Sequence, residues 1–197
     1  MILKILKIIL NPYYLIYKLA LRFIQNYEGF SYSFEKNGEK RMLDALSNSD
    51  ITTVFDVGAN VGEWTEIVTK KFSKAKIHSF EISRESFNEL QKKFQNNNQV
   101  FINNFGLSNK KGELQYKDYG KNSQINSIIT EGNFHDQRIT PKLVKAFAES
   151  GNNYCKNNNI KEIDLLKIDV EGAEHLVLNG FSDLLADGAI KIIQFEY

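Results

Sequence analysis

Thr53-Val54-Phe55-Asp56-Val57-Gly58-Ala59-Asn60-Val61-Gly62-Glu63-Trp64 is the most informative stretch of this 197-residue sequence. An apolar, β-branched run ends in an acid, a tight turn with two glycines follows, and a helical pattern then begins. Strand, glycine turn and helix in this order are typical of the nucleotide-type sites of α/β proteins. The stretch therefore predicts a strand over 51–56, a helix that starts near Gly62, and a ligand site at the turn.

The same alternation of strands and helices continues along the chain. Apolar runs predict further strands, and apolar stripes at helical spacing predict the helices between them. The predicted strands cover 75–81, 100–103, 163–169 and 189–197. Such alternation implies an α/β, Rossmann-like architecture, with a mostly parallel sheet, right-handed crossovers and helices on both faces.

The pattern is weaker in the middle of the sequence. A turn over 109–112 and a strand over 113–116 predict a hairpin. The polar segment 117–140 is typical of a loop that covers a site. The spacing of Leu143, Val144 and Phe147 predicts a helix over 142–153. A helix is also predicted over 172–185.

Polar side chains follow the predicted strands where a parallel sheet binds its ligands. The carboxyl ends of parallel strands meet at one edge of the sheet, and ligands bind there near the point where the strand order reverses. The residues at these ends are Asp56, Glu81, Asn103, Asp169 and Glu196. This convergence predicts a polar site at that edge.

The composition excludes several classes of function. The net charge of +1 gives no electrostatic attraction to nucleic acid, so no nucleic-acid partner is expected. Cys155 is the single cysteine, which rules out an intrachain disulfide and fits a reducing, cytoplasmic compartment. The sequence has no CxxC pair and no HExxH motif, so no zinc site is expected. Whether the chain forms a homo-oligomer stays open.

The segment 1–28 is apolar and basic, and with its connector it predicts a helical extension over 1–48 before a domain over 49–197. Four bases and no acid precede Glu28. No uncharged run reaches the roughly 20 residues that span a bilayer. Its apolar face either packs on the domain or lies at the acidic inner surface of a membrane.

The glycine turn discriminates between cofactors. A dinucleotide site has the pattern G-x-G-x-x-G, and here Asn60 puts a side chain at the second glycine position. Asp56 also places a negative charge at the turn, which disfavours a pyrophosphate and favours the ammonium and sulfonium of S-adenosylmethionine. Glu81 can accept the ribose hydroxyls of either cofactor and does not discriminate. A dinucleotide oxidoreductase is therefore the weaker alternative.

Five segments together resemble the FkbM-type S-adenosylmethionine-dependent methyltransferases, in the order of that family and over Ile51 to Tyr197. The segments are Phe55 to Gly62, Ser79-Phe80-Glu81, Gly106 to Gly112, Leu165 to Glu174, and Gln194-Phe195-Glu196-Tyr197. The resemblance implies a class I methyltransferase fold and O-methylation of a hydroxyl, often on a sugar or natural product. Family members normally continue beyond the position of Tyr197 through further strands, so we expect a sheet without those strands. A shortened module that binds cofactor or a partner without turnover is the alternative function.

The resemblance and the residue types assign roles to five cofactor-binding residues. Gly58 and Gly62 would let the backbone close around the methionine end of the cofactor. Asp56 would orient the cofactor through the loop or through its ammonium, or stabilise the loop. Asn60 would contact the cofactor carboxylate or hold the turn. Glu81 would bind the ribose.

Two acids are the catalytic candidates. Asp169 and Glu171 follow the strand over 163–169, close to where methyl donor and acceptor are expected to meet. Either could accept the hydroxyl proton or position the acceptor, although acids are also favoured at a helix N-terminus for capping. Glu171, Glu174 and His175 are neighbours on the next predicted helix, and we interpret them as a surface cluster rather than a metal site.

Overall fold

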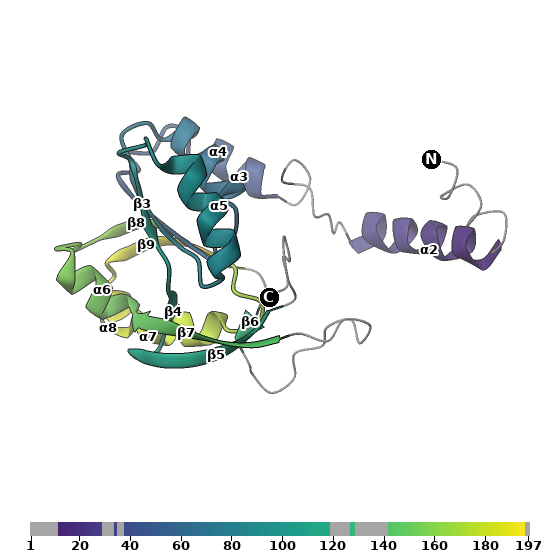
Figure 1. Cartoon of the computed structure of the whole chain (residues 1–197). Coiled ribbons are helices and arrows are strands. Elements are labelled where there is room, and N and C mark those ends of the chain that lie inside the picture. The colour runs from purple at the N-terminus through teal and green to yellow at the C-terminus, as the bar shows by residue number, and fades with distance from the viewer. Residues whose placement is uncertain (1–11, 29–33, 35–37, 119–126, 129–141, 196–197) are drawn as a thin grey trace. The chain divides into compact units, whose positions relative to one another are not determined.

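A computed structural model describes residues 12–28, 34, 38–118, 127–128 and 142–195 of the chain (Figure 1). The chain forms two units, Met1–Ser49 and Asp50–Tyr197. In the first unit, helix α2 covers Pro12–Glu28 and helix α3 covers Glu39–Ala45. Leu43 of α3 is buried. The apolar segment 1–11 lies outside the described residues.

The second unit is built on a five-stranded parallel sheet in the order β3-β2-β1-β8-β9. The strands are β1 (Thr53–Val57), β2 (Lys76–Phe80), β3 (Val100–Asn103), β8 (Ile163–Ile168) and β9 (Ile190–Phe195). The predicted parallel sheet is thereby confirmed. The chain runs outward from β1 to β3 and then returns to the other side of β1 with β8, so the strand order reverses between β1 and β8. Ligands of such sheets bind beside this reversal.

Helices cover both faces of the sheet, as predicted (Figure 1). On one side lie α4 (Glu63–Lys71) and α5 (Arg84–Phe94). On the other lie α6 (Gly151–Asn157), α7 (Glu174–Gly180) and α8 (Ser182–Ala186). Side chains alternate along each strand. Phe55 and Val57 therefore join the apolar core with Val177 and Phe181, while Asp56 between them faces α4.

The middle of the sequence forms a second sheet, with the strand order β4-β7-β5-β6. Its strands are β4 (Gly106–Ser108), β5 (Gly112–Asp118), β6 (Ser127–Ile128) and β7 (Lys142–Ser150). The strand predicted over 113–116 is confirmed as part of β5, which pairs antiparallel with β6 and β7. The turn predicted over 109–112 joins β4 to β5, which are not neighbours in this sheet, so the hairpin predicted across that turn is wrong. Most of the predicted loop over 117–140 lies outside the described residues.

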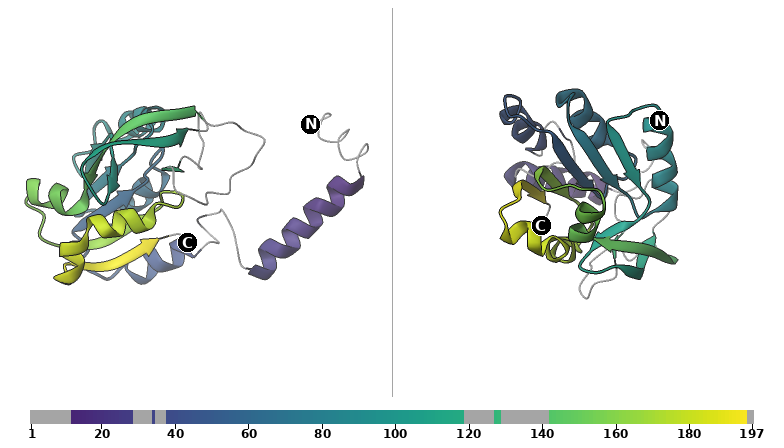
Figure 2. Two further views of the ribbon diagram at one scale, coloured as in Figure 1. Left: turned by 90° about the horizontal axis from the view of Figure 1, so that it is seen from below. Right: turned by 90° about the vertical axis from the view of Figure 1, so that its left-hand side faces the viewer.

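The predicted helix over 142–153 is wrong. This segment is β7, which pairs with β5 from Lys142 to Ala148 (Figure 2, left), followed by α6. Val144, Ala146 and Ala148 alternate toward the interior, while Leu143 and Phe147 on the other face are exposed. Apolar residues on both faces of a strand imitate helical spacing, and pairing with β5 decides the outcome.

The predicted helix over 172–185 is divided into α7 and α8 at Gly180 and Phe181. A β-carbon on Gly180 would lie 2.1 Å from the carbonyl oxygen of Ser108 in β4, so the chain passes too close for any side chain at this point. The helix also begins at Glu174 rather than at the predicted residue 172, because Glu171 and Gly172 both have left-handed backbone, with φ of 55° and 100°.

Candidate functional site

The glycine turn after β1 is held in one conformation by its backbone. Gly58 and Asn60 have left-handed backbone, with φ of 85° and 48°. The backbone N–H groups of Gly58 and Ala59 both donate to the carbonyl of Phe80, at 3.0 and 2.9 Å, and so tie the turn to the end of β2. A β-carbon on Gly58 would lie 1.8 Å from the carbonyl oxygen of Asp169. Glycine at this position therefore lets the turn pack on the segment after β8.

Gly62 serves a different contact. It begins α4 with φ of 78°, and a β-carbon there would lie 2.5 Å from Leu90 and 2.6 Å from Phe94. Both of these side chains belong to α5. Gly62 thus allows the two helices on this face to approach closely. The contacts of both glycines are with the protein itself, and their predicted role at the cofactor stays a prediction.

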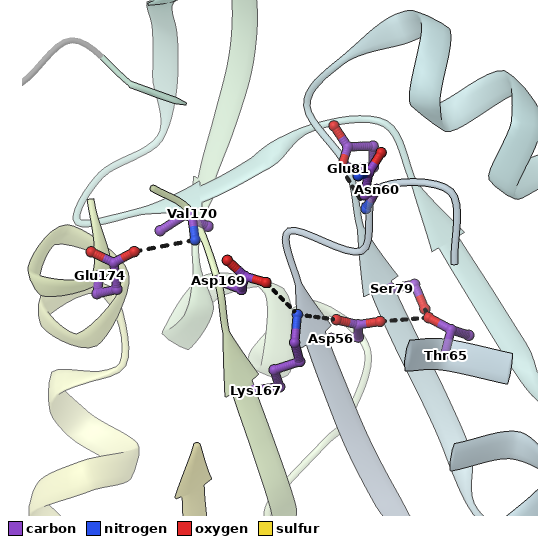
Figure 3. Close-up of polar contacts among 9 residues, drawn as sticks. All are labelled: Asp56, Asn60, Thr65, Ser79, Glu81, Lys167, Asp169, Val170 and Glu174. Atoms are coloured by element: carbon purple, nitrogen blue, oxygen red, sulfur yellow. Dashed lines mark hydrogen bonds and ion pairs between the residues drawn. The ribbon is translucent and has the colours of Figure 1, made fainter. Parts of the chain in front are cut away.

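A buried ionic cluster lies beneath the turn (Figure 3). The Asp56 carboxylate is fully buried and accepts a hydrogen bond of 2.6 Å from the Thr65 hydroxyl. The Lys167 ammonium lies 3.4 Å from the other Asp56 oxygen and 3.1 Å from a carboxylate oxygen of Asp169. Thr65 in turn lies 3.0 Å from the hydroxyl of Ser79. One cation therefore joins the ends of β1 and β8.

The register of the sheet explains this cluster. Asp56 in β1 and Lys167 in β8 are direct neighbours, so their side chains point to the same face. Burial raises the pKa of Asp56, while the charge of Lys167 and the hydrogen bond from Thr65 act against that shift. Asp56 is enclosed by these partners. Its predicted role at the cofactor stays a prediction.

Glu81 connects the turn to α5. It follows β2, is only 6% exposed, and accepts hydrogen bonds of 2.7 Å from the backbone N–H groups of Asn60 and Ser83. Burial raises the pKa of Glu81 to about 7, although the two backbone hydrogen bonds act against that rise. Glu81 is thus a buried carboxyl group that titrates near neutral pH.

Two polar atoms on the turn and α4 are buried without a hydrogen-bond partner among the described residues. They are the side-chain oxygen of Asn60, an acceptor, and the indole nitrogen of Trp64, a donor. Trp64 is 6% exposed, and its ring lies 5.7 Å from the Lys167 ammonium. Buried polar groups in native proteins normally have partners, so such atoms mark a place where a ligand can supply them.

The two catalytic candidates differ in their surroundings. Asp169 donates its backbone N–H to the carbonyl of Val57, and its side chain is 37% exposed on the far side of Lys167. Glu171 is half-buried in the strained turn before α7. The Glu174 carboxylate accepts hydrogen bonds from the backbone N–H groups of Val170 (Figure 3) and of Gly172, both in this turn. Glu174 thus helps to hold the turn that precedes α7.

The structure brings Asp56 and Asp169 together at the ends of β1 and β8, and Asn60 and Glu81 together beside β2 (Figure 3). Gly58 packs against the carbonyl of Asp169. It places Asn103 at the end of β3, where its amide donates to the carbonyls of Ser79 and Phe101. Glu196 lies outside the described residues.

Sequence reasoning missed Lys167, Thr65 and the polar edge of Trp64. The available signal for Lys167 was a single base inside the otherwise apolar run that ends β8. Trp64 and Thr65 fall within the helix predicted to start near Gly62, and no local motif distinguishes them there. Their roles depend on the strand order, which puts β8 next to β1.

Comparison with known proteins adds independent findings. The model of the methyltransferase FkbM domain matches residues 56–197. A curated relative, Methyltransferase 1 of Beauveria bassiana (strain ARSEF 2860), is 26% identical over 166 residues, which are 73% of this chain and 64% of the relative. A crystal structure of Methyltransferase FkbM from Methylobacillus flagellatus KT aligns with a TM-score of 0.48 and 14% identity, over 73% of this chain and 32% of that chain. The chain thus spans less than two thirds of either protein.

Proposed function

Because this chain belongs to the FkbM methyltransferase family, we propose that it uses S-adenosylmethionine to methylate a hydroxyl oxygen of a sugar or glycan-related metabolite. The family membership supports methyl transfer in general. The cofactor and the acceptor class rest on the resemblance of the motifs and on the chemistry of the site.

The observation that carries the cofactor proposal is the pair of unpartnered polar atoms at the turn. S-adenosylmethionine ends in an amino acid, which offers an ammonium donor and a carboxylate acceptor. The Asn60 side-chain oxygen can accept from the ammonium, and not from the carboxylate that the sequence predicted for it, because this oxygen has no proton to donate. The Trp64 indole N–H can donate to the carboxylate. Glu81, hydrogen-bonded to the same turn, can accept the ribose hydroxyls through its remaining lone pairs. The residues present therefore fit the cofactor.

The chain's own residues account for the proton in the proposed reaction. The bound cofactor supplies a methyl group activated by a positively charged sulfur. Transfer of this methyl group to the acceptor oxygen would leave the electron pair of the broken carbon–sulfur bond on sulfur and would release the hydroxyl proton. Asp169 is the candidate to accept that proton, because its carboxylate is partly exposed and Lys167 holds one of its oxygens. Glu171 is the candidate to position the acceptor.

Calorimetric titration with S-adenosylhomocysteine tests the proposal. We expect the wild-type chain to bind this product and Glu81→Ala to bind it more weakly. Glu85→Ala is the matched control, since Glu85 is an exposed acid of the neighbouring helix α5 and should retain wild-type affinity. Absence of binding by the wild type would refute the cofactor proposal, and tighter binding of NADH would favour the oxidoreductase alternative.

Transfer is measured separately from binding. Purified protein is incubated with S-adenosylmethionine carrying a deuterated methyl group and with sugar acceptors, and the products are examined by mass spectrometry. A labelled sugar that requires Asp169 supports the proposed reaction. Binding without transfer to any sugar tested would favour the alternative, a module that binds cofactor without turnover.

A further inference from the structure

Helix α2 carries a wide apolar face. Counting from Ile16, apolar side chains recur at −3, 0, +4, +7, +8 and +11, which is one face of an α-helix. The residues are Tyr13, Ile16, Ala20, Phe23, Ile24 and Tyr27. Large side chains along this face are highly exposed, with Phe23 at 71% and Tyr27 at 84%. An apolar surface of this size requires a partner that covers it.

The opposite side of α2 is basic. Lys18 and Arg22 are one turn apart there, and both are exposed. Leu15 lies on the same side of the helix, about one turn before Lys18. The sequence holds no acid before Glu28, while Lys4 and Lys7 add two further bases. A strongly apolar face beside uncompensated positive charge, with bulky aromatic residues, is the pattern of helices that lie in a membrane interface.

We propose that α2 docks the protein on the surface of a bilayer that contains anionic lipid. Its apolar face would enter the boundary between headgroups and acyl chains, and Lys18 and Arg22 would remain at headgroup level. The tyrosines suit this position, because their rings are apolar and their hydroxyls reach water. The length and charge of α2 suit a helix that lies on the membrane surface rather than one that spans the membrane. No helix in the described parts of the chain is long and apolar enough to cross a membrane.

Charge favours the bilayer over a second copy of the chain as the occupant of this face. Two copies of α2 packed face to face would gain nothing from their bases, which would lie on the outer sides of the pair, whereas anionic headgroups attract each base. Each basic side chain near an anionic surface contributes a factor of about 5 in partitioning, so Lys18 and Arg22 together contribute roughly 30-fold.

Vesicle flotation with the full chain tests this inference. The probes are vesicles of phosphatidylcholine alone and of phosphatidylcholine mixed with phosphatidylglycerol. We expect wild-type protein to float with the anionic vesicles and to remain behind with the neutral ones. Lys18→Gln combined with Arg22→Gln should lower partitioning roughly 30-fold. Phe23→Ser combined with Ile16→Ser should abolish it.

Leu15→Ser is the matched control. It makes the same kind of change on the basic side of the same helix, and it should retain most of the binding. Gel filtration of every variant shows whether the fold persists. Failure of the wild type to float with anionic vesicles would overturn the inference, as would equal loss for Leu15→Ser and for the apolar-face variant. Sedimentation that reveals a dimer dependent on Phe23, without vesicle binding, would assign the face to a second copy and also overturn it.

Discussion

Replacing Lys167 with methionine should destabilise the second unit by about 3–5 kcal/mol, the usual cost of removing one partner from a buried ion pair. The main reason is Asp56, which has no exposure to water and lies 3.4 Å from the Lys167 ammonium. At that distance and an effective dielectric constant of about 20, the attraction amounts to ~5 kcal/mol. Asp169 contributes less, because water reaches 37% of its side chain and can replace the lost cation.

Substitution of Asp56, the other member of the ion pair, provides the decisive comparison with Lys167→Met. In Lys167→Met, the hydrogen bond from Thr65 is the main remaining compensation for the Asp56 carboxylate. Asp56→Asn removes the charge that needs compensation, and the double variant Asp56→Asn/Lys167→Met leaves two neutral side chains. We therefore expect the double variant to lose at least about 2 kcal/mol less than the sum of the two single losses.

Urea denaturation followed by fluorescence measures these losses. Trp64 is the only tryptophan in the sequence and is buried beside Lys167, so its emission reports on the region that changes. Lys161→Met is the matched control, because Lys161 is exposed just before β8 and should cost less than about 0.5 kcal/mol. A loss below about 1 kcal/mol for Lys167→Met, or strict additivity in the double variant, would refute this view of the pair.

Three further variants follow from the same site. Burial holds the pKa of Glu81 at about 7, against an ordinary value of 4.5, so the folded protein binds this proton more tightly than the unfolded chain. Stability in urea should therefore fall by on the order of 3 kcal/mol as the pH rises from 4.5 to 7, and Glu81→Gln should lack this slope. Gly58→Ala should cost at least about 2 kcal/mol by the same measurement, since its β-carbon would overlap a backbone carbonyl. Gly188→Ala, with φ of 65° and open space around it, should cost only about 1 kcal/mol and is its control. Thr65→Val should lower the melting temperature, because it removes a donor from buried Asp56 at a cost of about 1–3 kcal/mol.

The fold was largely predictable because its central strands and flanking helices carry strong local patterns. The strands that become β1 and β8 are mostly apolar and short, and the helix that becomes α4 has a clear stripe. The second sheet was not predictable in the same way. β7 has apolar residues on both faces, so its local pattern fits a helix as well as a strand, and only its pairing with β5 decides between them.

The site was predictable in position but not in its contacts. The rule that ligands bind at the carboxyl ends of parallel strands located Glu81 and Asp169 correctly at the edge. No local pattern, however, states that β8 lies beside β1 in the register that places Lys167 next to Asp56. That contact joins residues 111 positions apart, and it determines which carboxylate is compensated by a cation and which is not.

Glu81 is the carboxylate whose protonation should respond to the proposed cofactor. Each of its oxygens now accepts one backbone N–H, and each retains a lone pair for a ribose hydroxyl, so binding need not break the turn. Hydrogen bonds from two ribose hydroxyls would favour the ionised form of Glu81. Below its pKa of about 7, this ionised form is the minor one. Binding of S-adenosylhomocysteine at pH 6 should therefore release nearly one proton, ~0.9 per site, and only ~0.1 at pH 8. Calorimetry in buffers of different ionisation enthalpy measures this number directly. Glu81→Gln should release none, and wild-type binding that is independent of the buffer at pH 6 would exclude Glu81 as the ribose acceptor.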